Sequence, residues 1–273
     1  MWPHCTRLVI SRTLSAGVAA WVLQGCASAN PSVIRGGRAA SADSALVARE
    51  RGLVDAPEGT LSVTPFRTTT ADPTISALGF ALADLLTTDL ARSARLALVE
   101  RGRLDEVLRE LDLARSGRVD STTAPRVGRL VGARRLILGG IDTLPGGTLR
   151  IAARIADVST GGVAQALDAS APLRDVLAAE KAIAFRLFDA LGVVLTPAER
   201  ALVEARPTRS LAALVAYGRG LESELRGDRA GATRDYLRAI DADPDFRRPR
   251  ERLSETRALA RTDAPGLLPG LRP

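Results

Sequence analysis

The first 25 residues constrain this chain most, because their loss decides which side chains the folded part can use. Arg7 and Arg12 precede an apolar stretch, Leu14–Leu23, of about ten residues. A helix of that length is too short to span a bilayer, and it has the size of a secretory-signal core. The sequence therefore predicts that residues 1–25 are a cleaved signal peptide.

The end of this stretch, Leu23-Gln24-Gly25-Cys26, resembles the lipobox of bacterial lipoproteins. The resemblance implies cleavage between Gly25 and Cys26 and attachment of acyl chains, palmitate among them, to Cys26. Several acyl chains anchor a protein stably, whereas one binds only marginally. Ala27 and Ser28 follow, and the lack of Asp there implies sorting to the outer membrane. We expect a lipid-anchored protein of the cell envelope, at the periplasmic face of the outer membrane. The alternative is a plain secretory signal with a chance cysteine.

Removing the signal peptide changes the inventory of reactive side chains. The residues lost with it are Met1, Trp2, His4, Cys5 and Trp21. The remaining chain has no histidine, and its one cysteine, Cys26, is the acylation site. Intramolecular disulfides, zinc sites made of His and Cys, and nucleophilic triads that need histidine are thereby excluded. We expect no cofactor, no metal and no catalytic residue. A periplasmic hydrolase with a carboxylate mechanism stays open as an alternative.

The charge balance argues against nucleic acid as a partner. Removing Arg7 and Arg12 lowers the formal net charge from +7 to +5, and Lys181 is the chain's single lysine. No run of five like charges occurs, and aromatic residues make up only 3% of the chain, too few for a base-stacking platform. We therefore expect no nucleic-acid partner.

Composition and periodicity divide the chain into five parts. They are a signal peptide (1–25), a lipid-anchored tether (26–58), an α/β domain (59–195), a helical region (196–262) and a flexible tail (263–273). In the α/β part we expect strands at 61–66, 96–99, 136–141, 149–155 and 163–171, and helices at 75–90, 104–117, 120–131 and 173–191. This order predicts a mixed sheet covered by helices.

The part after residue 195 is predicted to be all helical. Thr196-Pro-Ala-Glu199 has the capping-box pattern with proline in the first helical position. Three further helices are expected at about 210–225, 229–242 and 246–260. The fold class is therefore α/β followed by an all-α helical hairpin.

The α/β part resembles the CsgG-like family of periplasmic lipoprotein domains and, more distantly, the N-terminal domain of TolB. The resemblance runs from Gly79 to Gly161. The residues that carry it are Leu82-Ala-Asp-Leu-Leu-Thr-Thr-Asp-Leu90, Leu98-Val-Glu-Arg101, Leu104-Asp-Glu-Val-Leu108, Ser116-Gly-Arg-Val-Asp120, Leu130-Val-Gly-Ala133, Leu138-Gly-Gly140 and Asp157-Val-Ser-Thr-Gly161. An unrelated α/β domain is the alternative. The family implies oligomeric export channels with a membrane-spanning hairpin from each subunit, yet all strands here are expected in the domain's own sheet.

The helical part resembles a tetratricopeptide repeat, a 34-residue helical hairpin. The matching, repeat-packing residues are Gly220, Gly227, Ala232, Tyr236, Ala239 and Pro244. Small residues at 220, 227 and 232 are expected to let the two helices pack closely, and Pro244 to end the second. Because one repeat cannot bury its own face, the helix containing Leu253 is expected to cap it. An ordinary helical hairpin is the alternative.

The charged residues of the α/β part are interpreted as surface groups. The acidic ones are Asp84, Asp89, Glu100, Asp105 and Glu106, which we expect on solvated helix faces near arginines. Lys181 is expected to be exposed in the middle of its helix. Together with the lack of histidine, this predicts a protein that is not an enzyme.

Three functions remain. The first is a CsgG-like component of the assembly or export of an extracellular polymer or appendage, such as curli. The second is a tethered periplasmic adaptor whose α/β face and helical repeat contact a protein partner, or which self-associates as a homo-oligomer. The third is the hydrolase. The resemblance favours the first.

Overall fold

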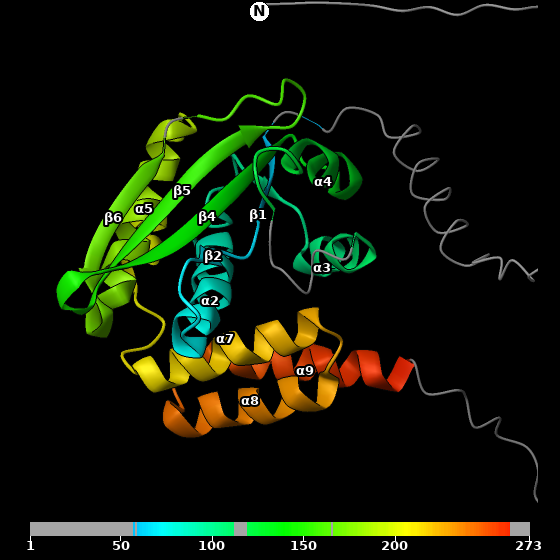
Figure 1. Ribbon diagram of the computed structural model, residues 1–273, viewed down its shortest axis with the longest axis vertical. Coiled ribbons are helices and arrows are strands. Elements are labelled where there is room, and N and C mark those ends of the chain that lie inside the picture. Colours follow the sequence, from blue (N-terminus) through cyan, green and yellow to red (C-terminus); the bar gives the residue numbers. More distant parts are fainter. Residues whose placement is uncertain (1–56, 58, 112–118, 165, 263–273) are drawn as a thin grey trace, which may run out of the picture. The chain divides into compact units, whose positions relative to one another are not determined.

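The computed structural model describes residues 57, 59–111, 119–164 and 166–262, all within one compact unit that spans 43–273. Its strands are β1 (Thr60–Val63), β2 (Arg67–Thr68), β3 (Ala97–Leu98), β4 (Arg135–Leu144), β5 (Thr148–Asp157) and β6 (Leu167–Pro172). Its helices are α2 (Pro73–Leu90), α3 (Arg101–Glu110), α4 (Ala124–Val131), α5 (Val176–Ala190), α6 (Pro197–Glu204), α7 (Leu211–Leu225), α8 (Arg229–Ala242) and α9 (Arg247–Thr262). The predicted order of strands and helices is confirmed apart from the two-residue strand β2, which was not predicted (Figure 1).

The strands form one mixed sheet in the order β3-β1-β4-β5-β6, with β2 paired to β4. β1 is parallel to β3 and to β4, whereas β4, β5 and β6 are antiparallel neighbours. β4 and β5 pair along their whole length, from Arg135 opposite Asp157 to Leu144 opposite Thr148. The predicted mixed sheet is therefore confirmed. The predicted last strand begins later than expected, because Val163 contributes only an isolated bridge to Ala156 before β6 starts.

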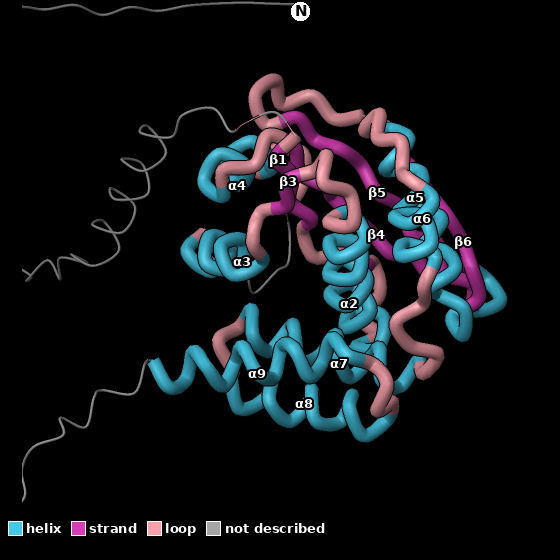
Figure 2. The backbone as a smooth tube through the Cα atoms, turned by 180° about the vertical axis from the view of Figure 1, so that it is seen from behind, coloured by secondary structure: helices cyan, strands magenta, loops and turns pink. Residues whose placement is uncertain are grey.

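Helices cover one face of β4, β5 and β6. Figure 2 shows α2, α5 and α6 in front of these strands, and Figure 1 shows the strands in front of α2 and α5. Leu149, Ile151 and Ala153 of β5 point into this core and are buried, while the residues between them are more exposed. The alternation is the period of two expected for a half-covered strand. Gly139 faces the core, where any Cβ would lie 2.0 Å from the Phe66 ring.

α2 is the central helix of the molecule. It begins at Asp72, whose carboxylate accepts a hydrogen bond from the Thr74 N–H (2.7 Å), with Pro73 as the first helical residue. The sheet packs on one side of α2 and the helices α5 and α7 on others, so that Leu78, Leu82 and Leu86 are fully buried. Each such leucine contributes roughly 1.5–3 kcal/mol of burial free energy.

The C-terminal helices pack directly on the α/β part. α7 crosses α2 so closely that a Cβ on Gly218 would lie 1.9 Å from the Ala77 carbonyl oxygen. Tyr217 packs against Tyr236 of α8 and against Phe246, with ring centroids 5.8 Å and 5.2 Å apart. The buried residues of both parts form one continuous hydrophobic core. The helical region therefore shares its core with the sheet domain.

Candidate interaction site

Among the described residues, the outer face of β4, β5 and β6 carries no helix except at the end next to α4, where Leu136 and Ala156 are buried (Figure 1). We call this surface the open sheet face. By strand register and alternation it includes Leu138, Gly140, Asp142, Arg150, Ala152, Arg154, Asp168 and Ser170, of which Leu138 is buried. Across neighbouring strands, Asp142 lies opposite Arg150, Gly140 opposite Ala152, and Ala152 opposite Asp168. The face therefore spans three strands and has small residues at its centre.

Charged side chains surround that small centre. Arg150 donates to Asp142 at 2.8 Å, with about half of the arginine side chain (48%) exposed. Thr69 donates to the other oxygen of the same carboxylate at 3.2 Å. Arg154 has no ion-pair or hydrogen-bond partner among the described residues. A flat centre with free charge at its margin suits contact with another protein surface.

The acidic residues interpreted as solvated divide into two groups. Glu100 and Glu106 are exposed as predicted. The interpretation was wrong for Asp84, Asp89 and Asp105, which are 2%, 5% and 6% exposed. The reason is that α2 and α3 have neighbours on several sides, so the polar stripe of each helix meets another helix instead of water. Lys181 is likewise 8% exposed, and the prediction of an exposed lysine was wrong.

Asp84 lies at the centre of a buried cluster that joins α2 to α3, α7 and α9. It accepts a hydrogen bond from the Tyr217 hydroxyl (2.6 Å) and from Arg248 (2.8 Å), and Arg101 lies 3.6 Å away. Burial alone would raise the pKa of Asp84, but the two guanidinium groups and the tyrosine hydroxyl outweigh it and lower the pKa. The carboxylate is therefore charged at neutral pH.

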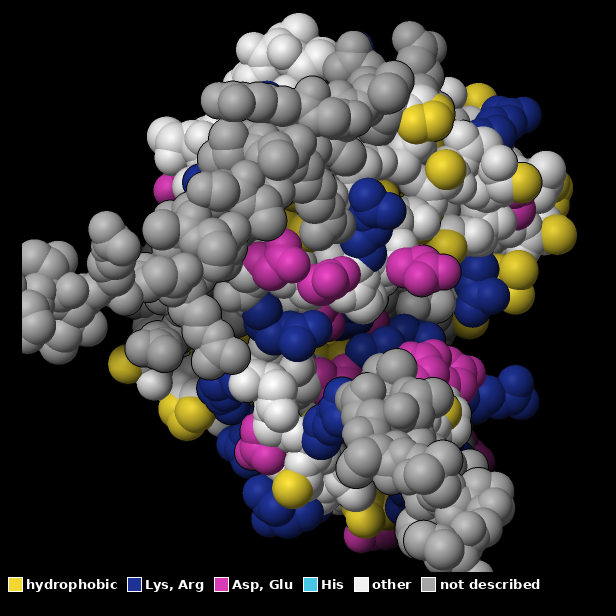
Figure 3. Space-filling model, turned by 90° about the vertical axis from the view of Figure 1, so that its right-hand side faces the viewer, with side chains coloured by type: hydrophobic (Ala, Val, Ile, Leu, Met, Phe, Trp, Pro, Cys, Tyr) yellow, Lys and Arg dark blue, Asp and Glu magenta, His cyan; other side chains and the backbone are white. Residues whose placement is uncertain are grey.

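The same junction continues along α9. Arg252 pairs with Glu224 of α7, and the Thr256 hydroxyl donates to that carboxylate at 2.5 Å. Arg101 also lies 3.5 Å from Asp105, whose pKa is raised by burial. Figure 3, viewed from the side of α3, shows acidic and basic side chains next to one another across a hollow. On the described part of this face neither charge forms a patch of its own.

The structure also locates the repeat residues predicted from the sequence. Ala232, Tyr236 and Ala239 are fully buried between α7 and α8. A Cβ on Gly220 would lie 2.3 Å from the Tyr236 ring, so this glycine permits the close approach of the two helices. Gly227 has a different role from the expected one.

Gly227 lies in the turn after α7 with φ of 79°, and nothing approaches its missing side chain within 4 Å. Its backbone conformation, instead of helix packing, calls for glycine there. Pro244 directly follows the C-cap residue Asp243 at the end of α8. Gly25 and Cys26 lie outside the described residues, as do the signal peptide and the tail.

The described residues show neither a membrane-crossing helix nor a metal cluster. None of their helices is both long and apolar enough to cross a bilayer. They also contain no group of three or more His, Cys, Asp or Glu side chains able to hold a metal ion.

Comparison with known proteins agrees with the sheet part of this geometry. Residues 58–147 match the family of the curli production assembly/transport component CsgG. The match runs from β1 to the end of β4 and confirms the resemblance of the α/β part to the CsgG-like family. It covers about a third of the chain and leaves the helical region outside, so the tetratricopeptide resemblance stays a prediction. No curated protein matches the sequence significantly.

Several solved structures are similar to part of the chain. The LpoB C-terminal domain from Salmonella enterica is 18% identical, covers 50% of this chain and 98% of its own, and has a TM-score of 0.33. TolB from Acinetobacter baumannii is 15% identical over 51% of this chain and 30% of its own, with a TM-score of 0.33. Lipoprotein GNA1162 from Neisseria meningitidis is 12% identical over 50% of this chain and 99% of its own, with a TM-score of 0.34.

Sequence reasoning predicted a half-exposed strand at 149–155 and a partner contact through the α/β part, but it did not assign the residues of the open sheet face, and it missed the buried clusters. The alternation of Arg150, Ala152 and Arg154 with apolar residues was the available signal for the face, since it marks a strand with one uncovered side. No comparable signal existed for the Asp84 cluster, because its members come from four helices that are distant in sequence.

Proposed function

We propose that this chain is a lipid-anchored protein of the cell envelope that takes part in the assembly or export of an extracellular polymer or appendage. It acts through protein contacts, not as an enzyme, and is held by acylated Cys26 at the periplasmic face of the outer membrane. The observation that carries the proposal is the match of residues 58–147 to the CsgG assembly/transport component.

The open sheet face is the contact surface of this proposal. Beyond its end next to α4 it is uncovered by described residues, it extends across three strands, and its small centre lets another backbone approach. The buried junction around Asp84 also favours the open sheet face as the contact surface. The junction fixes the helical region on α2, so the face of α7 that carries Tyr217 and Gly218 is already covered by α2.

A periplasmic scaffold that takes no part in export is the second candidate. The ten-residue strands β4 and β5 pair with each other fully, and β6 pairs with β5, so all three belong to the domain's own sheet. This arrangement favours a domain that binds and holds a partner.

The test is site-specific photocrosslinking in cells that encode the protein, with a photoreactive residue in place of Ala152. The matched control is Ala230, an exposed alanine on α8. We expect protein adducts from position 152, none from position 230, and loss of the adducts in the Cys26→Ala variant. Equal crosslinking at the two positions, or adducts unaffected by Cys26→Ala, would contradict the proposal.

A deletion strain separates the two candidates. Loss of the extracellular polymer from the cell surface, restored by the wild type but not by Ala152→Arg, is expected for an assembly component. Crosslinks at position 152 with unchanged surface polymer would favour the scaffold.

A further inference from the structure

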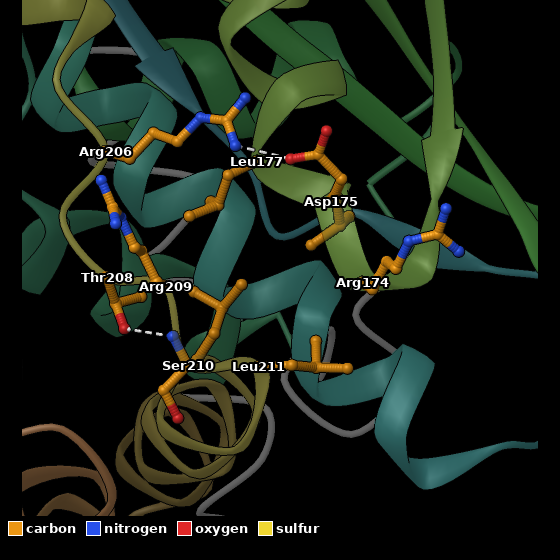
Figure 4. Close-up of a pocket in the computed structure, with 10 residues that line it drawn as sticks. Arg174, Asp175, Leu177, Arg206, Thr208, Arg209, Ser210 and Leu211 are labelled. Atoms are coloured by element: carbon orange, nitrogen blue, oxygen red, sulfur yellow. Dashed lines mark hydrogen bonds and ion pairs between the residues drawn. The ribbon is translucent and has the colours of Figure 1, made fainter.

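A cavity of about 420 Å³ lies where the α/β part continues into the helical region. Its walls come from the turn before α5 and from the segment that joins α6 to α7 (Figure 4). The apolar side chains of Val176, Leu177 and Leu214 line it and are buried. The remaining wall is polar, and arginine dominates it.

Three arginines meet one acidic residue at this cavity: Arg174, Arg206 and Arg209 against Asp175. Arg206 reaches across to Asp175 and pairs with it at 2.6 Å. Arg174 and Arg209 have no side-chain partner among the described residues. Figure 4 shows Arg206 and Arg209 on the α6–α7 segment and Arg174 on the opposite side, with its guanidinium group turned away from theirs. The cavity therefore carries two positive charges that the described part of the chain does not neutralise.

The α6–α7 segment is held in place by its own hydrogen bonds. The Thr208 hydroxyl, between the two arginines, donates to Asp243 at 2.5 Å and accepts from the Ser210 N–H at 2.9 Å. Ser210 in turn accepts from the Ala213 N–H at 3.1 Å and begins α7. A ligand would thus meet a wall whose backbone is already ordered, which lowers the entropy cost of binding.

We infer that this arginine-lined cavity binds an acidic segment of a protein partner, with one carboxylate at Arg209, a second at Arg174 and an aliphatic side chain over Leu177 and Leu214 between them. Guanidinium groups match carboxylates in two-pronged geometry. The volume suits a few residues of peptide, since ligand cavities start at about 300 Å³.

The apolar lining favours a peptide over a free phosphate, because Leu177 and Leu214 can pack against an aliphatic side chain but not against a phosphate group. The inference rests on the proposed function, because it names the kind of protein segment that the chain contacts.

The experiment uses the purified protein and an array of immobilised pentapeptides in which Asp or Glu alternates with Leu, Val, Ile or Ala. The matched array has Asn or Gln in place of the acids. We expect wild-type protein to bind members of the acidic array and to lose binding about tenfold or more on the amide counterparts, as for removed charged hydrogen bonds.

The variant Arg174→Ala/Arg209→Ala should lose the same factor, and both arginines are exposed, so folding is not at stake. The control is Arg234→Ala/Arg257→Ala, which removes two exposed arginines from α8 and α9 and should bind like the wild type.

Four outcomes would overturn the inference. They are equal binding to the two arrays, unchanged binding by the cavity variant, binding of inorganic phosphate in place of peptide, and binding of phosphatidylglycerol vesicles in place of peptide. Its failure is distinguishable from that of the proposed function. If position 152 crosslinks to a partner but no peptide binds, only the cavity inference is wrong. If peptide binds but position 152 gives no crosslinks, only the proposed role of the open sheet face is wrong.

Discussion

Two buried aspartates on one helix differ in nearly every electrostatic respect. Asp84 and Asp89 lie five residues apart on α2, and both are at most 5% exposed. Asp84 meets two arginines and a tyrosine hydroxyl, and its pKa is lowered. Asp89 meets Lys181 at 2.5 Å, but burial outweighs this contact and its pKa is raised.

The second cluster has too few cations for its acids. Lys181 lies 2.5 Å from Asp89 and 3.3 Å from Glu180, so two carboxyl groups share one ammonium. Burial and the neighbouring Asp89 raise the pKa of Glu180 to about 8. The comparison teaches that residue type and helix position do not decide the charge of a buried acid; the balance between burial and the cations and hydrogen-bond donors that face it does.

The largest expected effect comes from removing the Asp84 carboxylate. Asp84→Ala would remove the buried carboxylate that faces both Arg101 and Arg248. It would leave them only Asp105 and the exposed Glu251, so we expect a loss of about 3–5 kcal/mol in the free energy of unfolding. Urea unfolding at pH 7 measures it. The control is Asp142→Ala, which breaks an exposed pair with Arg150 and should cost below about 1 kcal/mol. Similar losses in the two variants would mean that the Asp84 cluster does not join the two parts.

Removing the lysine tests the other cluster. Lys181→Met would leave Asp89 and Glu180 without a cation, at a cost of roughly 3 kcal/mol at pH 8. Because both carboxyl groups can take up protons, the cost should shrink as the pH is lowered, whereas that of Asp84→Ala at the first cluster should not. Unfolding curves at pH 5 and pH 8 make the comparison. A cost of Lys181→Met that stays constant with pH would show that the two clusters behave alike.

The close approach that forms the Asp84 cluster can be disturbed without touching a charge. Gly218→Ala places a Cβ against the Ala77 carbonyl and should move α7 away from α2, at a cost of roughly 1–3 kcal/mol. Gly102→Ala on α3 is the matched control, since nothing lies within 4 Å of the added carbon, and it should be neutral or stabilise by up to about 1 kcal/mol. Thermal unfolding of the two variants measures the difference. Equal shifts in Tm would contradict close packing of α7 on α2 at Gly218.

The sequence allowed the helices and strands to be predicted, but not the tertiary contacts that each of them makes. The capping box at Thr196 and the apolar periodicity of residues 75–90 are local signals, which is why α6 and α2 lie where they were expected. The alternation in 149–155 likewise predicted β5. These signals act over a few residues and survive in any tertiary setting.

The candidate site depends on contacts that no local signal carries. Asp84 meets Tyr217 and Arg248, 133 and 164 residues away. A single-sided periodicity cannot tell a helix face in water from one covered by a second helix, so Asp84, Asp89 and Lys181 were assigned to the surface. The cavity at Arg209 depends in the same way on how α5 and α7 meet.

The smallest effect per pH unit, and the sharpest separation of the two clusters, lies in the dependence of stability on pH. The pKa of Glu180 in the folded protein, about 8, lies above its ordinary value of 4.5. Between these values the folded state holds more protons than the unfolded chain, so stability falls as the pH rises, by at most about 1.4 kcal/mol per pH unit for one proton. The lowered pKa of Asp84 acts in the opposite sense, since its stabilisation is present above pH 3.8 and is lost on acidification below that value.

Glu180→Gln should therefore flatten the decline of stability towards pH 8 and keep the loss of stability in acid. Asp84→Asn should keep the decline towards pH 8 and reduce the loss in acid. Urea unfolding at intervals from pH 3 to pH 9 measures both profiles, and a Glu180→Gln variant that declines like the wild type would assign the neutral-side slope to other groups.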